Sequence, residues 1–153
     1  MQKYAKIASY IRSHAVATLG TIDDDGTPYG AIIYVCCDDH HATVYFITKN
    51  GTRKYKNLTA RPDVSITVTN PGDISTVQAK GRASQVQDAT TLDMITTKIT
   101  RTLATAPEWL PPVAKLHAGE YAMVAVELTE ARLAEYAGKQ IGEPGIFTEA
   151  LSC

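Results

Sequence analysis

The sequence predicts an α+β protein in which six antiparallel strands form a closed or split β-barrel with helices outside it. Two observations lead to this fold class. Runs of β-branched and apolar residues alternate with short turn segments, and the segments with helical spacing fall before, between and after groups of these runs. The turns between the first three runs are too short for the crossover that parallel strands need, so these strands are expected to be antiparallel.

A short amphipathic helix opens the chain, and three strands follow it. Apolar residues at positions 4, 7, 8 and 11 predict the helix, which is expected to end near His14. The strands are expected at Val16–Ile22, Tyr29–Cys37 and Thr43–Thr48, with an Asp-Gly turn after the first. The second run, YGAIIYVCC, is almost entirely apolar, which is typical of a strand buried on both faces.

The next segment predicts a loop, a two-turn helix and two further strands. Thr52 is a suitable N-cap, and a proline at position 62 places the end of the helix near residue 60. Alternation of apolar and polar residues then predicts strands at Val64–Thr69 and Ile74–Val86. Small residues occupy the inner side of the second of these strands, as a tightly curved barrel requires: Ala79, Gly81 and Ala83.

The last third of the chain predicts two helices and one strand. Asp88 is a candidate N-cap for a helix that Pro107 ends, and a short second helix is expected over 111–117. The stripe of the longer helix consists of Leu92, Ile95, Ile99 and Leu103. The final strand is expected at Tyr121–Leu128, and the tail, about 138–153, has no periodicity and is expected to be irregular or docked on a partner.

Composition indicates one soluble domain over 1–153 but no function. The 153 residues carry a formal net charge of -1, which does not suit a nucleic-acid binder. No apolar stretch approaches the roughly 20 residues that span a bilayer, so no membrane contact is expected. Three cysteines, two of them adjacent, do not make a disulfide framework, so a cytoplasmic location is the default expectation.

Arg53 and Lys54 are the most unusual local feature. The predicted helix places both cations in its first turn, where the partial positive charge of the helix favours anions instead. A bound phosphate would resolve this, because backbone N–H groups, the Thr52 hydroxyl and both side chains would converge on it. The alternative interpretation is two solvated cations on a surface helix.

Other candidates are weaker. The sequence CCDDHH at 36–41 contains metal-ligand types, but adjacent strand residues point to opposite faces, so no metal site is expected. His14 or His117 is a conceivable haem ligand, although a packed histidine is the more common case. Trp109 either stacks on an aromatic ligand or fixes its loop to the core, and the acidic run at 23–25 is interpreted as a solvated turn rather than a calcium loop.

The known catalytic signatures are missing. The chain contains no G-x-S-x-G, P-loop, G-x-G-x-x-G or H-E-x-x-H motif, so no catalytic residue is assigned. This favours a cofactor-dependent enzyme or a binding protein over a hydrolase.

Three segments resemble the FMN-binding split-barrel family of pyridoxamine 5′-phosphate oxidase and its relatives. They are VATLGTIDDDGTPYGAIIYV, TVYFITKNGTRKYKNLTARPDVSITV and VQAKGRASQV, within residues 14 to 86. The resemblance implies a split barrel, FMN as cofactor, and a homodimer with the cofactor at the interface and a small molecule as substrate. It assigns cofactor-binding roles to Ile32, Ile33, Tyr34, Ile47, Thr48, Thr52, Arg53, Lys54 and Thr76.

The chain also departs from the oxidase pattern. An arginine opens and a lysine closes the second-strand motif of the oxidase, but Ala31 and Cys36 stand there, and the C-terminal arginine and tryptophan signature is absent. Pyridoxine phosphate is therefore not the expected substrate. The expected function is an FMN-dependent oxidoreductase. The alternatives are a reductase using the deazaflavin F420, with Lys49, Lys56 or Lys80 near its acidic tail, or a flavin or haem carrier or sensor without turnover.

Overall fold

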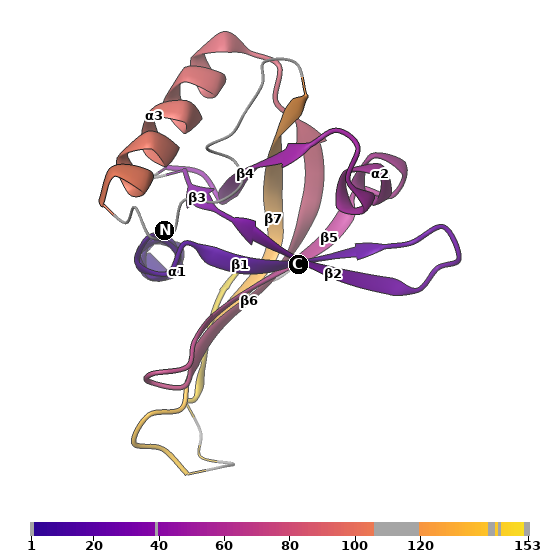
Figure 1. The fold of residues 1–153 in the computed structure, drawn as a ribbon. Coiled ribbons are helices and arrows are strands. Elements are labelled where there is room, and N and C mark those ends of the chain that lie inside the picture. The colour runs from indigo at the N-terminus through magenta and orange to yellow at the C-terminus, as the bar shows by residue number, and fades with distance from the viewer. Residues whose placement is uncertain (1, 39, 106–119, 141–142, 144, 152–153) are drawn as a thin grey trace.

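The protein is an antiparallel sheet that curls on itself, with three helices outside it in the described part of the chain (Figure 1). The computed structural model describes residues 2–38, 40–105, 120–140, 143 and 145–151. The strands lie side by side in the order β2 (Pro28–Tyr34), β1 (Val16–Ile22), β5 (Asp63–Asn70), β6 (Ser75–Gln85), β7 (Tyr121–Glu135), β4 (Thr43–Lys49) and β3 (Cys36–Cys37). A further strand, β8 (Phe147–Leu151), pairs with β7. The helices are α1 (Gln2–Ser13), α2 (Arg53–Ala60) and α3 (Ala89–Thr105).

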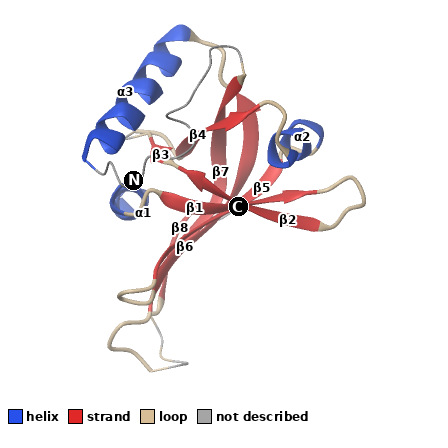
Figure 2. Cartoon of the chain, viewed as in Figure 1, coloured by secondary structure: helices blue, strands red, loops and turns tan. Residues whose placement is uncertain are grey.

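One bent strand closes the curled sheet. β2 and β3 are consecutive, and Val35 between them donates its amide to Ala15 O at 2.8 Å. β2 pairs with β1 at one end of the sheet, whereas β3 pairs with β4 at the other, where Cys36 faces Tyr45. Further along, β2 and β4 are in contact but not paired, so the barrel is split there (Figure 2). The predicted α+β split barrel is confirmed.

The core fills the inside of this barrel and continues under α1. Alternate residues of β1, β5, β6 and β7 point inward and are buried, as their burial patterns show. Ile7 and Ile11 of α1 are fully buried against them, because the apolar stripe at helical spacing faces the sheet. None of the helices in the described ranges is long and apolar enough to cross a membrane.

Most predicted elements are confirmed close to their expected bounds. The first helix, the first strand, the two-turn helix and the two alternating strands lie where local periodicity places them. Asp88 caps α3, since its Oδ2 accepts a bond from the Thr91 amide at 2.8 Å. The predicted helix over 111–117, with Trp109 and His117 beside it and in it, lies outside the described residues.

The apolar run at 29–37 is not buried on both faces, contrary to the prediction. Burial alternates along β2, and Ile32 is 69 % exposed while its neighbour Ile33 is 3 % exposed. The physical reason is that only the inner face of β2 packs on the core, and no described element covers Ile32 on the outer face.

The tail is not wholly irregular, which corrects a second expectation. β8 pairs with the far end of β7, and β7 itself continues to Glu135 rather than ending at Leu128. Together with the β5–β6 turn, this hairpin projects away from the barrel (Figure 1). The segment was not recognisable because its sequence does not alternate and its connection to β7 is long for a hairpin.

Gly81 marks the point where β6 and β7 approach most closely. The pairing register of these strands shifts between Lys80 and Gly81. A Cβ at position 81 would lie 2.5 Å from Glu127 O and 2.7 Å from Val126 Cγ1, distances that real Cβ atoms do not adopt. The prediction that small residues occupy the inner side of β6 is thus confirmed. Glycine is required at position 81 because the β7 backbone leaves no room for a side chain there.

We expect Gly81→Ala to lower the free energy of unfolding by about 1–3 kcal/mol, because β7 backbone must move to admit the methyl group. Gly51→Ala is the matched control, since nothing lies within 4 Å of a Cβ built there. Urea unfolding of both variants measures the difference. Equal stability of the two variants would show that the β6–β7 contact is not tight.

Candidate functional site

The turn between β1 and β2 holds three aspartates in three different environments. Gly26 adopts a positive φ of 83°, and Asp23 N donates to Thr27 O at 2.9 Å, which closes the turn. Asp25 Oδ1 accepts bonds from the Thr27 amide at 3.0 Å and its hydroxyl at 2.6 Å. Asp24 is almost fully exposed, whereas Asp23 is only 8 % exposed and lies under α2. The prediction of a solvated turn is therefore wrong for Asp23.

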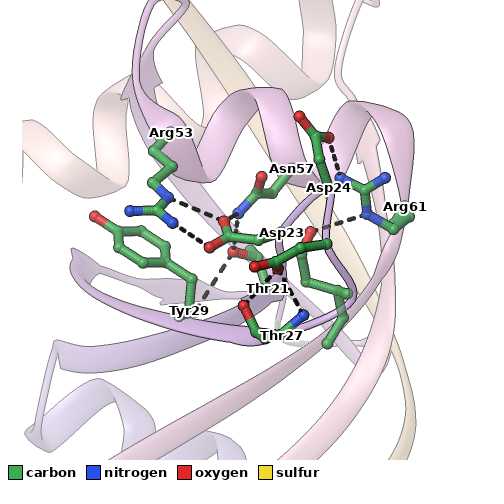
Figure 3. Close-up of polar contacts among 10 residues, drawn as sticks. Thr21, Asp23, Asp24, Thr27, Tyr29, Arg53, Asn57 and Arg61 are labelled. Carbon is green, nitrogen blue, oxygen red and sulfur yellow. Dashed lines mark hydrogen bonds and ion pairs between the residues drawn. The ribbon is translucent and has the colours of Figure 1, made fainter.

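Asp23 is the centre of a polar network that joins this turn to α2 (Figure 3). Its Oδ1 accepts bonds from Asn57 Nδ2 at 2.6 Å and from Arg53 Nε at 2.9 Å, and Arg53 Nη2 donates to Oδ2. Asn57 is buried and its Nδ2 also donates to Thr21 Oγ1 at 3.1 Å. The bonds from Arg53 and then from Asn57 hold the pKa of the Asp23 carboxyl below its ordinary value.

Arg53 is held in place while most of its side chain remains exposed. Its guanidinium carbon lies 4.5 Å from the centre of the Tyr29 ring, and its side chain is 61 % exposed. A guanidinium carries five N–H donors, of which the two-point contact with Asp23 uses one on Nε and one on Nη2. Of the three remaining N–H donors, two lie on the edge between Nη1 and Nη2, so this edge can receive a second anion.

A second arginine fixes the other end of α2. Arg61 Nε donates to Ile22 O at 2.9 Å, and its Nη2 donates to Asp24 Oδ1 at 2.7 Å. The turn therefore contacts α2 at both its first and its last turn (Figure 3). This defines where the N-terminus of α2 lies relative to β1 and β2.

The N-terminus of α2 has no side-chain cap. Thr52 has extended geometry, but its hydroxyl donates to Lys49 O at 2.9 Å and lies 3.0 Å from Thr48 Oγ1, so it makes no cap bond. The first turn contains no acidic residue. The N–H groups that begin the helix therefore have no side-chain acceptor, and the partial positive charge of the helix is not neutralised.

Lys54 adds a cation to this uncapped end. It is half-buried, and burial lowers the pKa of its ammonium group. No carboxylate in the described part of the chain pairs with it. A partly desolvated ammonium in the first turn of an uncapped helix is a group that a phosphate-like anion can pair with.

The split of the barrel lies next to this cationic end. β2 has β1 as its neighbour in the described sheet, so alternate backbone groups of β2 point to its other, unpaired edge. Ile32, Ile33 and Tyr34 belong to this strand, and Ile47 and Thr48 belong to β4, which contacts it. The Ile33 and Thr48 side chains are buried, so these two residues can offer mainly backbone groups to a ligand.

Thr76 lies apart from these residues within the chain. Tyr55 of α2 reaches Gln85 near the end of β6, and Thr76 is nine residues back along the same strand, about 30 Å away at about 3.3 Å per residue. Its hydroxyl donates to Val68 O at 3.0 Å. One chain thus brings together the predicted residues of β2, β4 and α2, but not Thr76.

In the described part of the chain, geometry supports neither a metal site nor His14 as a haem ligand, and His117 lies outside the described residues. Within the described ranges no three His, Cys, Asp or Glu residues lie together as a metal site would need. His14 stacks on Tyr10 with ring centres 4.5 Å apart, and its Nδ1 lies 3.0 Å from Tyr10 O.

Three residues of the network were not predicted from the sequence: Asp23, Tyr29 and Asn57. The sequence held one signal for Asn57. It is a polar residue directly before Leu58, which lies on the buried side of the helix. No signal in the sequence separates Asp23 from its two neighbours, because the difference between them is tertiary.

The chain matches known proteins in sequence pattern and in fold. The family model described as pyridoxamine 5′-phosphate oxidase matches residues 5–135. No curated protein sequence matches the chain. General stress protein 26 from Bacillus anthracis is 16 % identical with a TM-score of 0.68, over 98 % of this chain and 100 % of that one.

Two further solved structures are similar in fold. A pyridoxamine 5′-phosphate oxidase-related, FMN-binding protein from Nostoc punctiforme has 13 % identity and a TM-score of 0.62, over 94 % of this chain and 87 % of that one. A haem-binding protein from Mycobacterium smegmatis has 14 % identity and a TM-score of 0.71, over 97 % of this chain and 57 % of that one. At these identities the likeness shows the split-barrel fold.

The lowered pKa of Asp23 predicts how stability depends on pH. The carboxylate contributes to stability fully above its ordinary pKa of about 4, and the contribution is lost as pH falls through the lower folded-state value. The stability difference between the wild type and Asp23→Asn is therefore expected to be constant from about pH 7 to 5 and to shrink below about pH 4. Urea unfolding across this range measures it, and equal m-values for both proteins serve as the control. A difference that persists undiminished in acid would contradict the network.

Proposed function

Because the chain belongs to the pyridoxamine 5′-phosphate oxidase family, we propose that it binds FMN by the phosphate and acts as an FMN-dependent oxidoreductase on a small molecule. The observation that carries this proposal is the uncapped, cationic N-terminus of α2 beside the unpaired edge of β2. The family resemblance alone would not assign a ligand to this chain.

The residues at α2 fit a phosphate group. The backbone N–H groups of the first turn, the half-buried Lys54 ammonium and three Arg53 donors are available to oxygen acceptors. Charge-assisted bonds of this kind contribute about 1.5–3 kcal/mol each. Thr52 and Thr48 stand next to them with hydroxyls that exchange one bond.

The edge of β2 fits the polar rim of a flavin ring. Its unpaired backbone N–H and C=O groups need partners, and a heteroaromatic ring with alternating donors and acceptors can supply them. Ile32, Ile33 and Tyr34 would offer this edge, with Ile47 on β4 beside it. The FMN-binding protein from Nostoc punctiforme, which has the same fold, supports the choice of FMN.

We further propose that the cofactor lies at the interface of a homodimer. Ile32 exposes 69 % of its surface on the outer face of β2, and a second copy would bury it. A second copy is also the way to bring Thr76 near a cofactor, because one chain keeps it distant from α2. A cytoplasmic location stays our expectation, since the three cysteines do not form a disulfide framework.

The division of work follows from the residues present. Flavin, when bound, supplies the transfer of hydride or electrons. The chain contributes phosphate binding at α2, orientation of the ring along β2, and exclusion of water by the barrel wall. No acid or base side chain is required for these tasks, which agrees with the lack of a catalytic signature.

Two other cofactors remain as alternatives to FMN. A deazaflavin such as F420 would use the same ring edge and extra cations for its tail. Haem is favoured by one observation, the fold likeness to the haem-binding protein from Mycobacterium smegmatis. The absorption spectrum separates them, because an FMN protein is yellow and a haem protein has a Soret band.

We expect the purified protein to bind FMN, and Lys54→Gln to weaken this binding about tenfold or more, because a desolvated ammonium is lost from the phosphate site. Lys56→Gln is the matched control, since Lys56 is an exposed cation of the same helix. Quenching of flavin fluorescence measures the affinity. Equal affinity of the two variants would remove the phosphate site from α2, and a Soret band without flavin binding would favour haem.

A further inference from the structure

The Asp23 carboxylate has more hydrogen-bond partners and less solvent exposure than a carboxylate in an ordinary surface ion pair. It is 8 % exposed, and Asn57 fixes it from the buried side through a bond of 2.6 Å. Asn57 is in turn fixed by Thr21, which is itself buried on β1. The carboxylate is therefore shielded from solvent, unlike those of its two neighbours in the turn, and its hydrogen bonds fix the orientation of both oxygens.

This rigid carboxylate sets the orientation of Arg53. The long side chain of Arg53 is 61 % exposed, so without a partner it would sample many rotamers. The two-point contact with Asp23 and the Tyr29 ring below it restrict the guanidinium to one orientation, with the edge between Nη1 and Nη2 turned away from Asp23. That edge is the part of Arg53 that can reach a phosphate at the α2 N-terminus.

The contact is not needed merely to attach α2 to the barrel. Leu58 and Asn57 of α2 are buried, and Arg61 already ties the end of the helix to Ile22 and Asp24. An asparagine at position 23 would keep one oxygen for Asn57 but would lose the charge and the second oxygen that accepts from Arg53. The helix is therefore expected to stay in place in such a variant.

Two electrostatic effects of Asp23 on a bound phosphate oppose each other. The carboxylate repels the phosphate, but its charge is compensated by the guanidinium that it holds, and that guanidinium lies between the two anions. The ordering of Arg53 is not compensated by anything else, because Tyr29 supplies a surface and no hydrogen bond. We therefore expect the ordering of Arg53 to be the larger effect, and the affinity of Asp23→Asn for FMN decides between the two.

We propose that Asp23 is a positioning residue that, by orienting Arg53, makes the site discriminate a flavin carrying a phosphate from one without it. This rests on the proposed function of the α2 N-terminus. Asp23 touches neither cofactor nor substrate and acts through Arg53.

The test compares FMN with riboflavin, which lacks the phosphate, by fluorescence titration of the full chain. Asp23→Asn is expected to weaken FMN binding about tenfold and to change riboflavin binding less than about twofold. In an Arg53→Ala background, Asp23→Asn is expected to cause no further weakening of FMN binding, because there is no guanidinium left to orient. The matched control is Asp25→Asn, which removes a charge from the same turn but bonds only to Thr27, and it is expected to leave both affinities within about twofold.

Two results with Asp23→Asn would overturn the proposal. Equal weakening of FMN and riboflavin would make Asp23 a purely structural residue, and unchanged or tighter FMN binding would mean that repulsion outweighs ordering. A wild type that binds neither flavin would instead defeat the proposed function, and this is visible before any variant is made. If Asp23→Asn does not fold, Tyr29→Leu removes the ring under Arg53 and is expected to lower the same FMN-to-riboflavin preference, and an unchanged preference contradicts the proposal.

Discussion

A buried carboxylate links the turn of the first hairpin to the first turns of α2. Taking a charge out of water is costly unless partners surround it, and Asp23 finds those partners only on α2, in Arg53 and Asn57. Neither the turn nor the helix can move without breaking bonds to a desolvated charge. The N-terminus of α2 is thereby fixed beside the Tyr29 end of β2, where the barrel is split.

The split of the barrel arises because one continuous stretch of extended chain pairs with two different strands. The chain from Pro28 to Cys37 pairs with β1 in its first part and with β4 in its last, and it bends at Val35. Backbone groups on the free edge of β2 are the consequence, and they lie near the cationic helix end. An anionic group and a flat ring with hydrogen-bonding edges can therefore be held by neighbouring parts of the same scaffold.

Local patterns in the sequence predicted the helices and strands, whereas features that depend on tertiary contacts could not be predicted from it. The helix stripe at Ile7 and Ile11 and the alternation along β5 and β6 are periodic signals, so their bounds were predictable. The exposure of Ile32 was not predictable, because the sequence of an apolar strand is the same whether or not a second layer of structure covers its outer face. The burial of Asp23 was not predictable either, since the three consecutive aspartates differ only in their tertiary contacts, and only Asp23 lies under α2. The Arg53–Lys54 pair was found because it breaks a local rule of helix ends.

The same bent strand also indicates what the proposed enzyme acts on. In the related oxidase pattern a cation stands at each end of this strand, whereas this chain has Ala31 and Cys36. Cys36 is half-buried, and its partial burial raises the pKa of the thiol to about 11, so the group is neutral at physiological pH. Neither of these two side chains can therefore balance a phosphate. Lys98 of α3 lies beside the second position, since its Nζ donates to Cys37 O at 2.7 Å. A substrate that contacts the two side chains is therefore expected to gain no charge balance from them, and an anionic group near Cys36 would have to be met by Lys98.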